Sequence, residues 1–175
     1  STLVLQSQLI QTAIPTLAAV LGRDLPAVEV KSPQHYIDLN KFAASLHQES
    51  PSRQTQLLQM KLLVWLTQTT TGDLDELHLT TYRAPLFMQI RHTGDSGTPF
   101  INPYYTLDFY RRLRASIDRA AIVVTNHAFL SRHADLLDLE APFLVVDEAQ
   151  HFADNTAAAF AQRIDLAQIR RQLRH

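Results

Sequence analysis

The chain has 175 residues and contains no cysteine, only four glycines, and no excess of charge of either sign. The lack of cysteine excludes disulfides, thiolate nucleophiles, zinc ribbons and cysteine-ligated iron–sulfur clusters. Sixteen Lys and Arg against seventeen Asp and Glu give a net charge of −1, so any contact with a polyanion must be local. With 46% hydrophobic residues, the chain is long and apolar enough to bury a core.

Charge is also missing from residues 1–22, a stretch long enough to suggest a membrane segment. Polar residues and Pro15 interrupt it, so we expect a core-facing helix and no membrane partner. Apolar residues four positions apart form its predicted buried stripe, which comprises Leu5, Leu9, Ala13, Leu17 and Leu21. Because Ser1 lies inside this patterned segment and no Met precedes it, we expect the chain to be part of a longer protein.

The hydrophobic pattern predicts an α/β fold. Alternation over residues 27–31 indicates a short strand or an extended connector, and residues 106–120 form a predicted helix. Helices are also expected after the Ser32-Pro33 and Ser50-Pro51 dipeptides, the second of them heavily buried through Leu57, Leu58, Met60, Leu62, Leu63, Trp65 and Leu66. Proline and glycine are frequent from 83 to 105, which predicts a long loop there.

Two runs rich in β-branched residues, at 121–125 and 143–146, are typical of buried parallel strands. The helical stretch between them has the length of a crossover, so we expect a β-α-β unit, followed by a helical tail from Ala149. The second run ends in Asp147 and Glu148, at the edge where open α/β sheets bind ligands. An acidic pair there can hold Mg²⁺ with nucleotide phosphates, although two solvated acids at a strand end are also common.

Several motifs that follow one another along the chain favour a Mg²⁺-binding acidic pair over two solvated acids. Asp147-Glu148-Ala149-Gln150 resembles the Walker B element (DEAH box) of superfamily 2 helicases. Other segments resemble the XPD/DinG-like branch of that superfamily: Thr2–Leu9 (motif Ia), Val30–Ser32 with Tyr36–Leu39, Thr71–Leu77, Asp108–Arg112, and Asn126-His127-Ala128 before the box. The resemblance covers nearly the whole chain. It implies a RecA-like parallel-sheet motor domain with a mainly helical inserted domain, in a cytoplasmic bacterial protein.

The chain departs from the family pattern at three points, which restrict the resemblance to one group of the family and to part of its machinery. Asp38 stands where the first cluster cysteine would be, so an iron–sulfur cluster is excluded and packing must hold the insert. The chain is therefore similar to the cluster-free DinG-type helicases of Gram-positive bacteria. Gln150 replaces the usual His of the box. No G-x-G-K-[ST] phosphate loop occurs, so we expect no ATP hydrolysis by this chain alone.

The resemblance implies four regions. Residues 1–27 belong to helicase domain 1, residues 28–119 form the inserted domain, residues 120–163 complete helicase domain 1, and residues 164–175 begin an arch-like insert. Within them, Asp147 would bind Mg²⁺, Glu148 would position the attacking water, and Gln150 with His151 would relay the nucleotide state. ATP and Mg²⁺ are the implied cofactors of the full-length protein.

Contacts with single-stranded DNA, the implied partner, have weaker candidates. The resemblance suggests Thr2 and Gln6 of motif Ia, while charge and aromatic character suggest Lys31, Tyr36, Arg111 and Arg112. A solvated Lys31, a core-packed Tyr36 and a solvated arginine face are the alternatives. Trp65 is expected in the core and His127 as a hydrogen-bonded histidine beside the sheet; a metal shared by Asp147 and His151 lacks a third ligand.

These observations predict part of an ATP-dependent DNA helicase that moves 5′ to 3′ on single-stranded DNA. The alternative is a non-catalytic single-strand-binding or wedge module whose acidic pair is structural. A further exonuclease domain in the parent is a third possibility, on which these residues do not bear. The sequence leaves the oligomeric state open.

Overall fold

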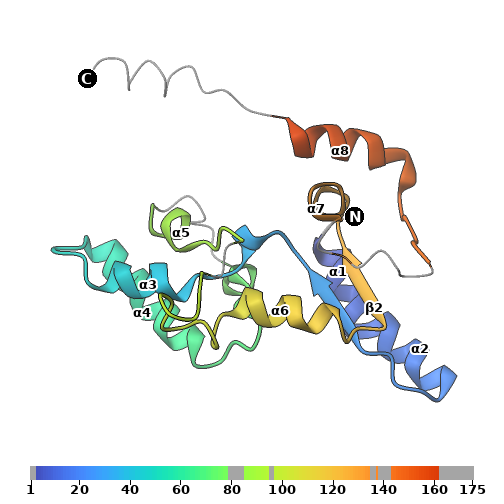
Figure 1. The fold of residues 1–175 in the computed structure, drawn as a ribbon, viewed down its shortest axis with the longest axis horizontal. Coiled ribbons are helices and arrows are strands. Elements are labelled where there is room, and N and C mark those ends of the chain that lie inside the picture. The colour runs from blue at the N-terminus through green and yellow to red at the C-terminus, as the bar shows by residue number, and fades with distance from the viewer. Residues whose placement is uncertain (1–2, 79–84, 95–96, 135–136, 138–142, 162–175) are drawn as a thin grey trace.

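The computed structural model describes residues 3–78, 85–94, 97–134, 137 and 143–161 (Figure 1). Two short parallel strands lie at one end of the molecule and a group of helices at the other, which confirms the predicted α/β class. In chain order the elements are α1 (Leu3–Gln8), η1 (Leu9–Ala13), α2 (Ile14–Leu21), β1 (Ala27–Val30), η2 (Pro33–His35), α3 (Leu39–Leu46), α4 (Arg53–Leu66), η3 (Leu74–Leu77), α5 (Pro85–Ile90), α6 (Phe109–Ile117), β2 (Ile122–Thr125), α7 (His127–His133), η5 (Ala149–His151) and α8 (Phe152–Phe160).

The sheet joins segments far apart in the sequence. β1 pairs with β2 in parallel, from Ala27 opposite Ile122 to Val30 opposite Thr125. The Thr125 hydroxyl also donates a hydrogen bond to the Val30 carbonyl at 2.9 Å. Residues 31–121 therefore form one long excursion between neighbouring strands, with α3, α4 and α5 at its far end (Figure 1).

The predicted strand over 143–146 is wrong. These residues have no ladder partner within the described parts of the chain, and the Val145 side chain is 90% exposed. The described partner of β2 is β1, so the expected pairing of 121–125 with 143–146 is not found. An apolar run becomes a strand only where another strand offers its backbone groups, which local sequence does not reveal.

Two hydrophobic clusters hold the molecule together, and α6 takes part in both. The larger lies in the helical region and includes Phe42, Leu62, Phe87 and the α6 residue Phe109. The smaller lies on the sheet and comprises Val30, Phe129 and Ile117, at the other end of α6. The predicted helix over 106–120 is thus present as α6, which spans the distance between the helical region and the sheet (Figure 1).

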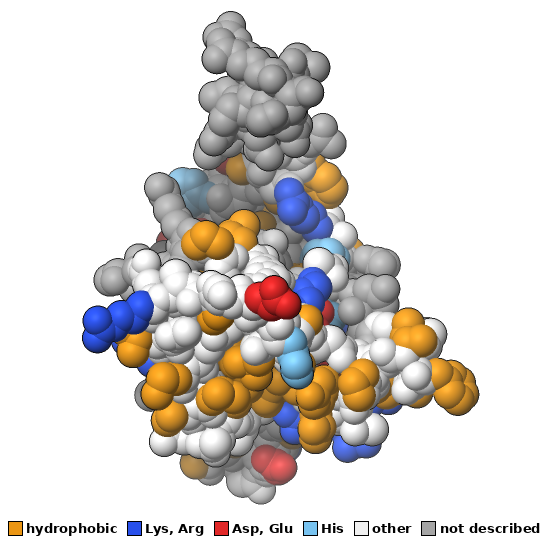
Figure 2. All heavy atoms as spheres, turned by 90° about the vertical axis from the view of Figure 1, so that its left-hand side faces the viewer, with side chains coloured by type: hydrophobic (Ala, Val, Ile, Leu, Met, Phe, Trp, Pro, Cys, Tyr) orange, Lys and Arg blue, Asp and Glu red, His pale blue; other side chains and the backbone are white. Residues whose placement is uncertain are grey.

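The helical region departs from two predictions. In α4 only one face is buried, with Leu58, Leu62 and Trp65 inward, so Trp65 is confirmed as a core residue. Four other large side chains of α4 are exposed: Leu57, Met60, Leu63 and Val64. Figure 2 shows a band of hydrophobic side chains on this end of the molecule. The predicted loop 83–105 contains α5, which buries Phe87 and Ile90 and completes the core.

The N-terminal helix buries the opposite side from the one expected. Leu5, Leu9, Leu17 and Leu21 of the predicted stripe are exposed, whereas Gln6 and Ile14 are buried. Pro15 cannot donate a backbone hydrogen bond, and the π-helical turn η1 precedes it. The leucines of the stripe are exposed on both sides of this turn, so a change of helical phase alone does not account for their exposure. No helix in the described residues is long and apolar enough to cross a bilayer.

A buried polar pair fixes the start of α6. Asp108 caps the helix by accepting from the Arg111 amide at 2.8 Å, and its other oxygen receives the His92 Nε2–H at 3.1 Å. His92 accepts the Gly94 amide at Nδ1, which assigns the proton to Nε2. Burial raises the pKa of Asp108, but the His92 and Arg111 hydrogen bonds outweigh it and leave the pKa below its ordinary value.

Gly72 packs directly against α6. Its φ is +68°, in the left-handed region, and a Cβ at this position would overlap the Phe109 ring. We expect Gly72→Ala to lower the free energy of unfolding by about 3 kcal/mol, since conformational strain adds to overpacking. Gly22→Ala is the control, with the same backbone conformation and open space, and should cost only about 1 kcal/mol. Equal losses in urea unfolding would contradict this packing.

The Asp108 carboxylate predicts an acid-dependent loss of stability. Because its folded pKa lies below the value of 3.8 in the unfolded chain, its stabilisation is complete above that value and disappears as pH falls through the folded pKa. Asp108→Asn should cost about 1 kcal/mol near neutral pH and flatten the decline below about pH 4. Urea unfolding over this pH range tests it; Asp118→Asn, at the exposed end of α6, should keep the wild-type decline.

Candidate functional site

The acidic pair occupies a tight, exposed turn before η5. Glu148 adopts a left-handed conformation with φ of 51°, and its amide donates to the Asp147 Oδ1 atom at 3.0 Å. The His151 amide then donates to the Glu148 carbonyl at 2.9 Å. Both carboxylates face solvent, so the turn presents two acids side by side at the surface.

His127 holds this turn from the start of α7. Its Nε2–H donates to the Asp147 carbonyl at 2.9 Å, and its Nδ1 lies 3.0 Å from the Asn155 amide nitrogen on α8. The ring also meets Phe152 edge-on, with centroids 5.2 Å apart. Since a carbonyl only accepts, Nε2 carries the proton and Nδ1 accepts from Asn155. The prediction of a hydrogen-bonded histidine is confirmed.

The donor set of the turn is suited to a hard cation. Asp147 uses Oδ1 for the Glu148 amide, and its carboxylate remains exposed. Glu148 receives a hydrogen bond from the Gln150 side chain, which orients that carboxylate. Oxygen donors open to solvent are the ligands that Mg²⁺ takes together with phosphate oxygens. His151 is exposed, and among the described residues neither it nor Asp147 belongs to a group of three or more side chains placed to hold a metal.

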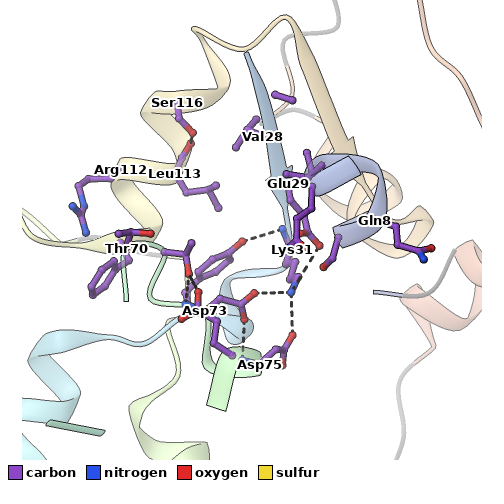
Figure 3. Close-up of a pocket in the computed structure, with 18 of the residues that line it drawn as sticks. Gln8, Val28, Glu29, Lys31, Thr70, Asp73, Asp75, Arg112, Leu113 and Ser116 are labelled. Carbon is purple, nitrogen blue, oxygen red and sulfur yellow. Dashed lines mark hydrogen bonds and ion pairs between the residues drawn. The ribbon is translucent and has the colours of Figure 1, made fainter. Parts of the chain in front are cut away.

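A groove of about 940 Å³ separates α1 and β1 from η3 and α6 (Figure 3). In it the Lys31 ammonium lies 2.5 Å from Asp73, 3.4 Å from Asp75 and 3.8 Å from Glu29. Burial lowers the pKa of Lys31, but the surrounding carboxylates, led by Asp73, leave it above its ordinary value. Burial raises the pKa of Glu29 despite Lys31.

The same cluster contains atoms placed closely enough for a metal. The ligand atoms of His35, Asp73 and Asp75 lie within 4.8 Å of one another. The positive charge that these carboxylates need is already supplied by Lys31, however, and His35 is hydrogen-bonded to Asp75 at 2.9 Å. One ammonium therefore faces three carboxylates, those of Glu29, Asp73 and Asp75, and holds this cluster through ion pairs.

Three of the candidate DNA-contacting residues, Lys31, Tyr36 and Arg112, line the larger groove. Lys31 is 5% exposed inside its ion pairs, and Tyr36 is buried with its hydroxyl accepting from the Lys31 amide at 3.3 Å. Gln6 is buried, and neither of its amide atoms has a hydrogen-bond partner in the described part of the chain, whereas Thr2 lies outside that part. DNA contact by Lys31 stays a prediction that would require the ammonium to leave its carboxylates.

The two arginines of α6 are more accessible to a DNA strand than Lys31 and Tyr36 are. Arg112 is exposed and Arg111 half-buried. The Arg111 guanidinium stacks on Tyr105 at 4.0 Å, and that of Arg112 lies 4.7 Å from the centre of the Phe109 ring. Sequence reasoning missed the contacts of His127 with Asn155 and of Lys31 with Asp73. No local pattern signals either pair, because the partners are 28 and 42 positions apart.

Removing the Lys31 charge should expose its structural role. Lys31→Met leaves the Asp73 and Asp75 carboxylates without their cation, so we expect a loss of about 3 kcal/mol in the free energy of unfolding. Adding Asp73→Asn should recover part of that loss, because one uncompensated charge is removed. Thermal and urea unfolding measure both variants, with Lys61→Met on the exposed face of α4 as the control. An unchanged stability of Lys31→Met would contradict this assignment.

No protein-family model matches the chain. Among curated proteins, the chain is 31% identical over 153 residues to a protein of Bacillus subtilis named 3′-5′ exonuclease DinG, covering 85% of this chain and 16% of that protein. Proteins of the same name from Staphylococcus saprophyticus and Staphylococcus aureus are 31% and 28% identical over 99% of the chain. The chain spans less than a fifth of the length of these relatives. The similarity supports a relationship between this chain and one segment of the DinG family.

Proposed function

We propose that the chain supplies the acidic ATP-hydrolysing element of a DinG-type, ATP-dependent DNA helicase that moves 5′ to 3′ on single-stranded DNA. The observation that carries this proposal is the exposed Asp147-Glu148 turn, held by His127 in a chain similar to DinG proteins. In this proposal β1 and β2 belong to a RecA-like motor domain of a cytoplasmic protein. The helical excursion is its insert, stabilised by packing and ion pairs instead of a cluster.

Each residue of the turn has a distinct task in this proposal. Asp147 holds Mg²⁺, which when bound neutralises charge on the nucleotide phosphates. Glu148 orients the attacking water and accepts its proton. Gln150 donates to the Glu148 carboxylate, so a shift of Gln150 reorients that group. His127 keeps the Asp147 backbone in place through its carbonyl. The phosphate-binding loop comes from outside this chain.

Neutralising the water-orienting acid should remove hydrolysis and spare nucleotide binding. In the full-length protein we expect Glu148→Gln to lower DNA-stimulated ATP hydrolysis by at least about 100-fold, the usual contribution of a general base. ATP binding, measured with a fluorescent analogue, should change little because the Asp147 charge remains. Glu49→Gln, an exposed glutamate outside the turn, is the matched control. Unchanged hydrolysis by Glu148→Gln would refute the motor assignment and favour a non-catalytic DNA-binding module.

The name of the relatives, 3′-5′ exonuclease, motivates a second candidate function. Nucleases also use carboxylates to hold metal ions, so the same pair could serve strand cleavage. We favour the motor role, with any exonuclease located in the remainder of such proteins. Measuring nuclease activity on single-stranded DNA with the same Glu148→Gln protein separates the two: a motor element leaves cleavage intact, whereas a nuclease site loses it.

A further inference from the structure

A second groove, of about 400 Å³, lies between the helical region and α7. Segments that are distant in sequence form its walls: η2, α3, the end of α5 and the end of α7. The charged side chains that line it are Lys41, Arg91 and Arg132, with His133 beside them. Above the hydrophobic band on this end of the molecule, Lys, Arg and His side chains lie with an acidic side chain beside them (Figure 2).

Charge distinguishes this groove from the larger one. The larger groove is lined by four carboxylates, from Glu29, Asp73, Asp75 and Glu76, against the two cations Lys31 and Arg112. No carboxylate lines the smaller groove among the described residues, so its three cations give it a positive field. A phosphate group is repelled by the first lining and attracted by the second.

The wall of the groove around Arg91 is prearranged by the backbone. Arg91 forms an antiparallel bridge with Ile37, and the Lys41 ammonium donates to the Arg91 carbonyl at 2.8 Å. The Arg91 Nε–H is buried and has no hydrogen-bond acceptor in the described structure. A buried donor without an acceptor is costly, whereas the Arg91 side chain as a whole is half-buried and lines the groove.

The opposite wall comes from α7. Arg132 is exposed and has no carboxylate within ion-pair distance in the described parts of the chain. The His133 ring packs on Phe129, with centroids 4.8 Å apart. Lys41 is partly compensated, because Asp38 lies 3.6 Å from its ammonium. The unpaired positive charge of the groove therefore resides mainly in Arg91 and Arg132.

We propose that this groove binds backbone phosphates of single-stranded DNA, chiefly through Arg91 and Arg132. The inference deepens the proposed motor function by naming where the strand crosses the chain. α7 links this groove to the acidic turn, because His127 at its first position contacts Asp147 and Arg132 lies in its last turn. The distance along seven helical residues is about 10 Å. A strand held here thus touches the same helix that positions the acidic turn.

The test is the salt dependence of oligo(dT) binding by the full-length protein without nucleotide. Fluorescence anisotropy of a labelled strand gives the slope of log Kd against log salt concentration. Removing one phosphate contact lowers this slope by about 0.7 on single strands, so Arg91→Gln/Arg132→Gln should lower it by about 1.4 and weaken binding at least about tenfold. Arg132→Lys keeps the charge and should retain the slope. Arg53→Gln, at the exposed start of α4, is the matched control.

A wild-type slope in the double variant, with an unchanged unfolding midpoint, overturns the proposal. An equal loss of slope in Arg53→Gln also overturns it. So does a fall in slope for Arg112→Gln while the double variant keeps the wild-type slope, because the strand would then contact α6 instead of this groove. The double variant could also lose inorganic phosphate binding, measured by ³¹P NMR, and keep the wild-type oligo(dT) slope. The groove would then be a site for free phosphate, and the proposal would be refuted. Failure of the motor proposal gives a different result. In that case Glu148→Gln keeps its ATP hydrolysis, while the double variant still loses salt dependence of oligo(dT) binding.

Discussion

A single buried ammonium connects the two halves of this molecule. Lys31 follows the last residue of β1, and its charge lies between Glu29 of the strand and the acidic side chains of η3. Because a buried charge is tolerated only with partners, the chain must bring Asp73 and Asp75 back to the end of the strand. The Tyr36 bridge to Asp73 and the tyrosine hydroxyl on the Lys31 amide follow from that return. These contacts tie the helical region to the end of β1 within the larger groove.

The elements with strong local signals were predictable. The helices expected after Ser32-Pro33, after Ser50-Pro51 and over 106–120 are present, although the capping residues are Asp38, Ser52 and Asp108. The β-branched residues of β1 and β2 indicate strands, but their mutual pairing was not expected. Residues 143–146 carry the same signal and form no strand, because pairing depends on a neighbour. The leucine stripe of the N-terminal helix fails for a related reason: periodicity identifies an apolar face but not what covers it. Within the predicted loop, Phe87 and Ile90 outweighed the nearby glycines and prolines.

Some of the candidate functional residues can be found from the sequence, whereas others are brought together only by the fold. The Asp147-Glu148 pair is contiguous, so motif order along the chain finds it without a structure. The Arg91 and Arg132 pair is separated by forty-one positions and meets only because β1 and β2 are neighbours. Lys31 shows the opposite error: its charge suggested a contact with an external anion, yet internal carboxylates already satisfy it. Sequence gives the chemistry of a side chain, whereas the partner that uses it depends on tertiary packing.

One consequence concerns how displacement passes through the molecule. α6, β2 and α7 follow one another directly, and α6 has a residue in each hydrophobic cluster. A nine-residue helix of about 13 Å anchored at both ends cannot slide against either cluster, so it moves as a lever arm. His127 begins α7 one residue after β2, and it contacts the acidic turn. A continuous run of packed elements thus joins the acidic turn to Phe109, where Gly72 leaves no free space.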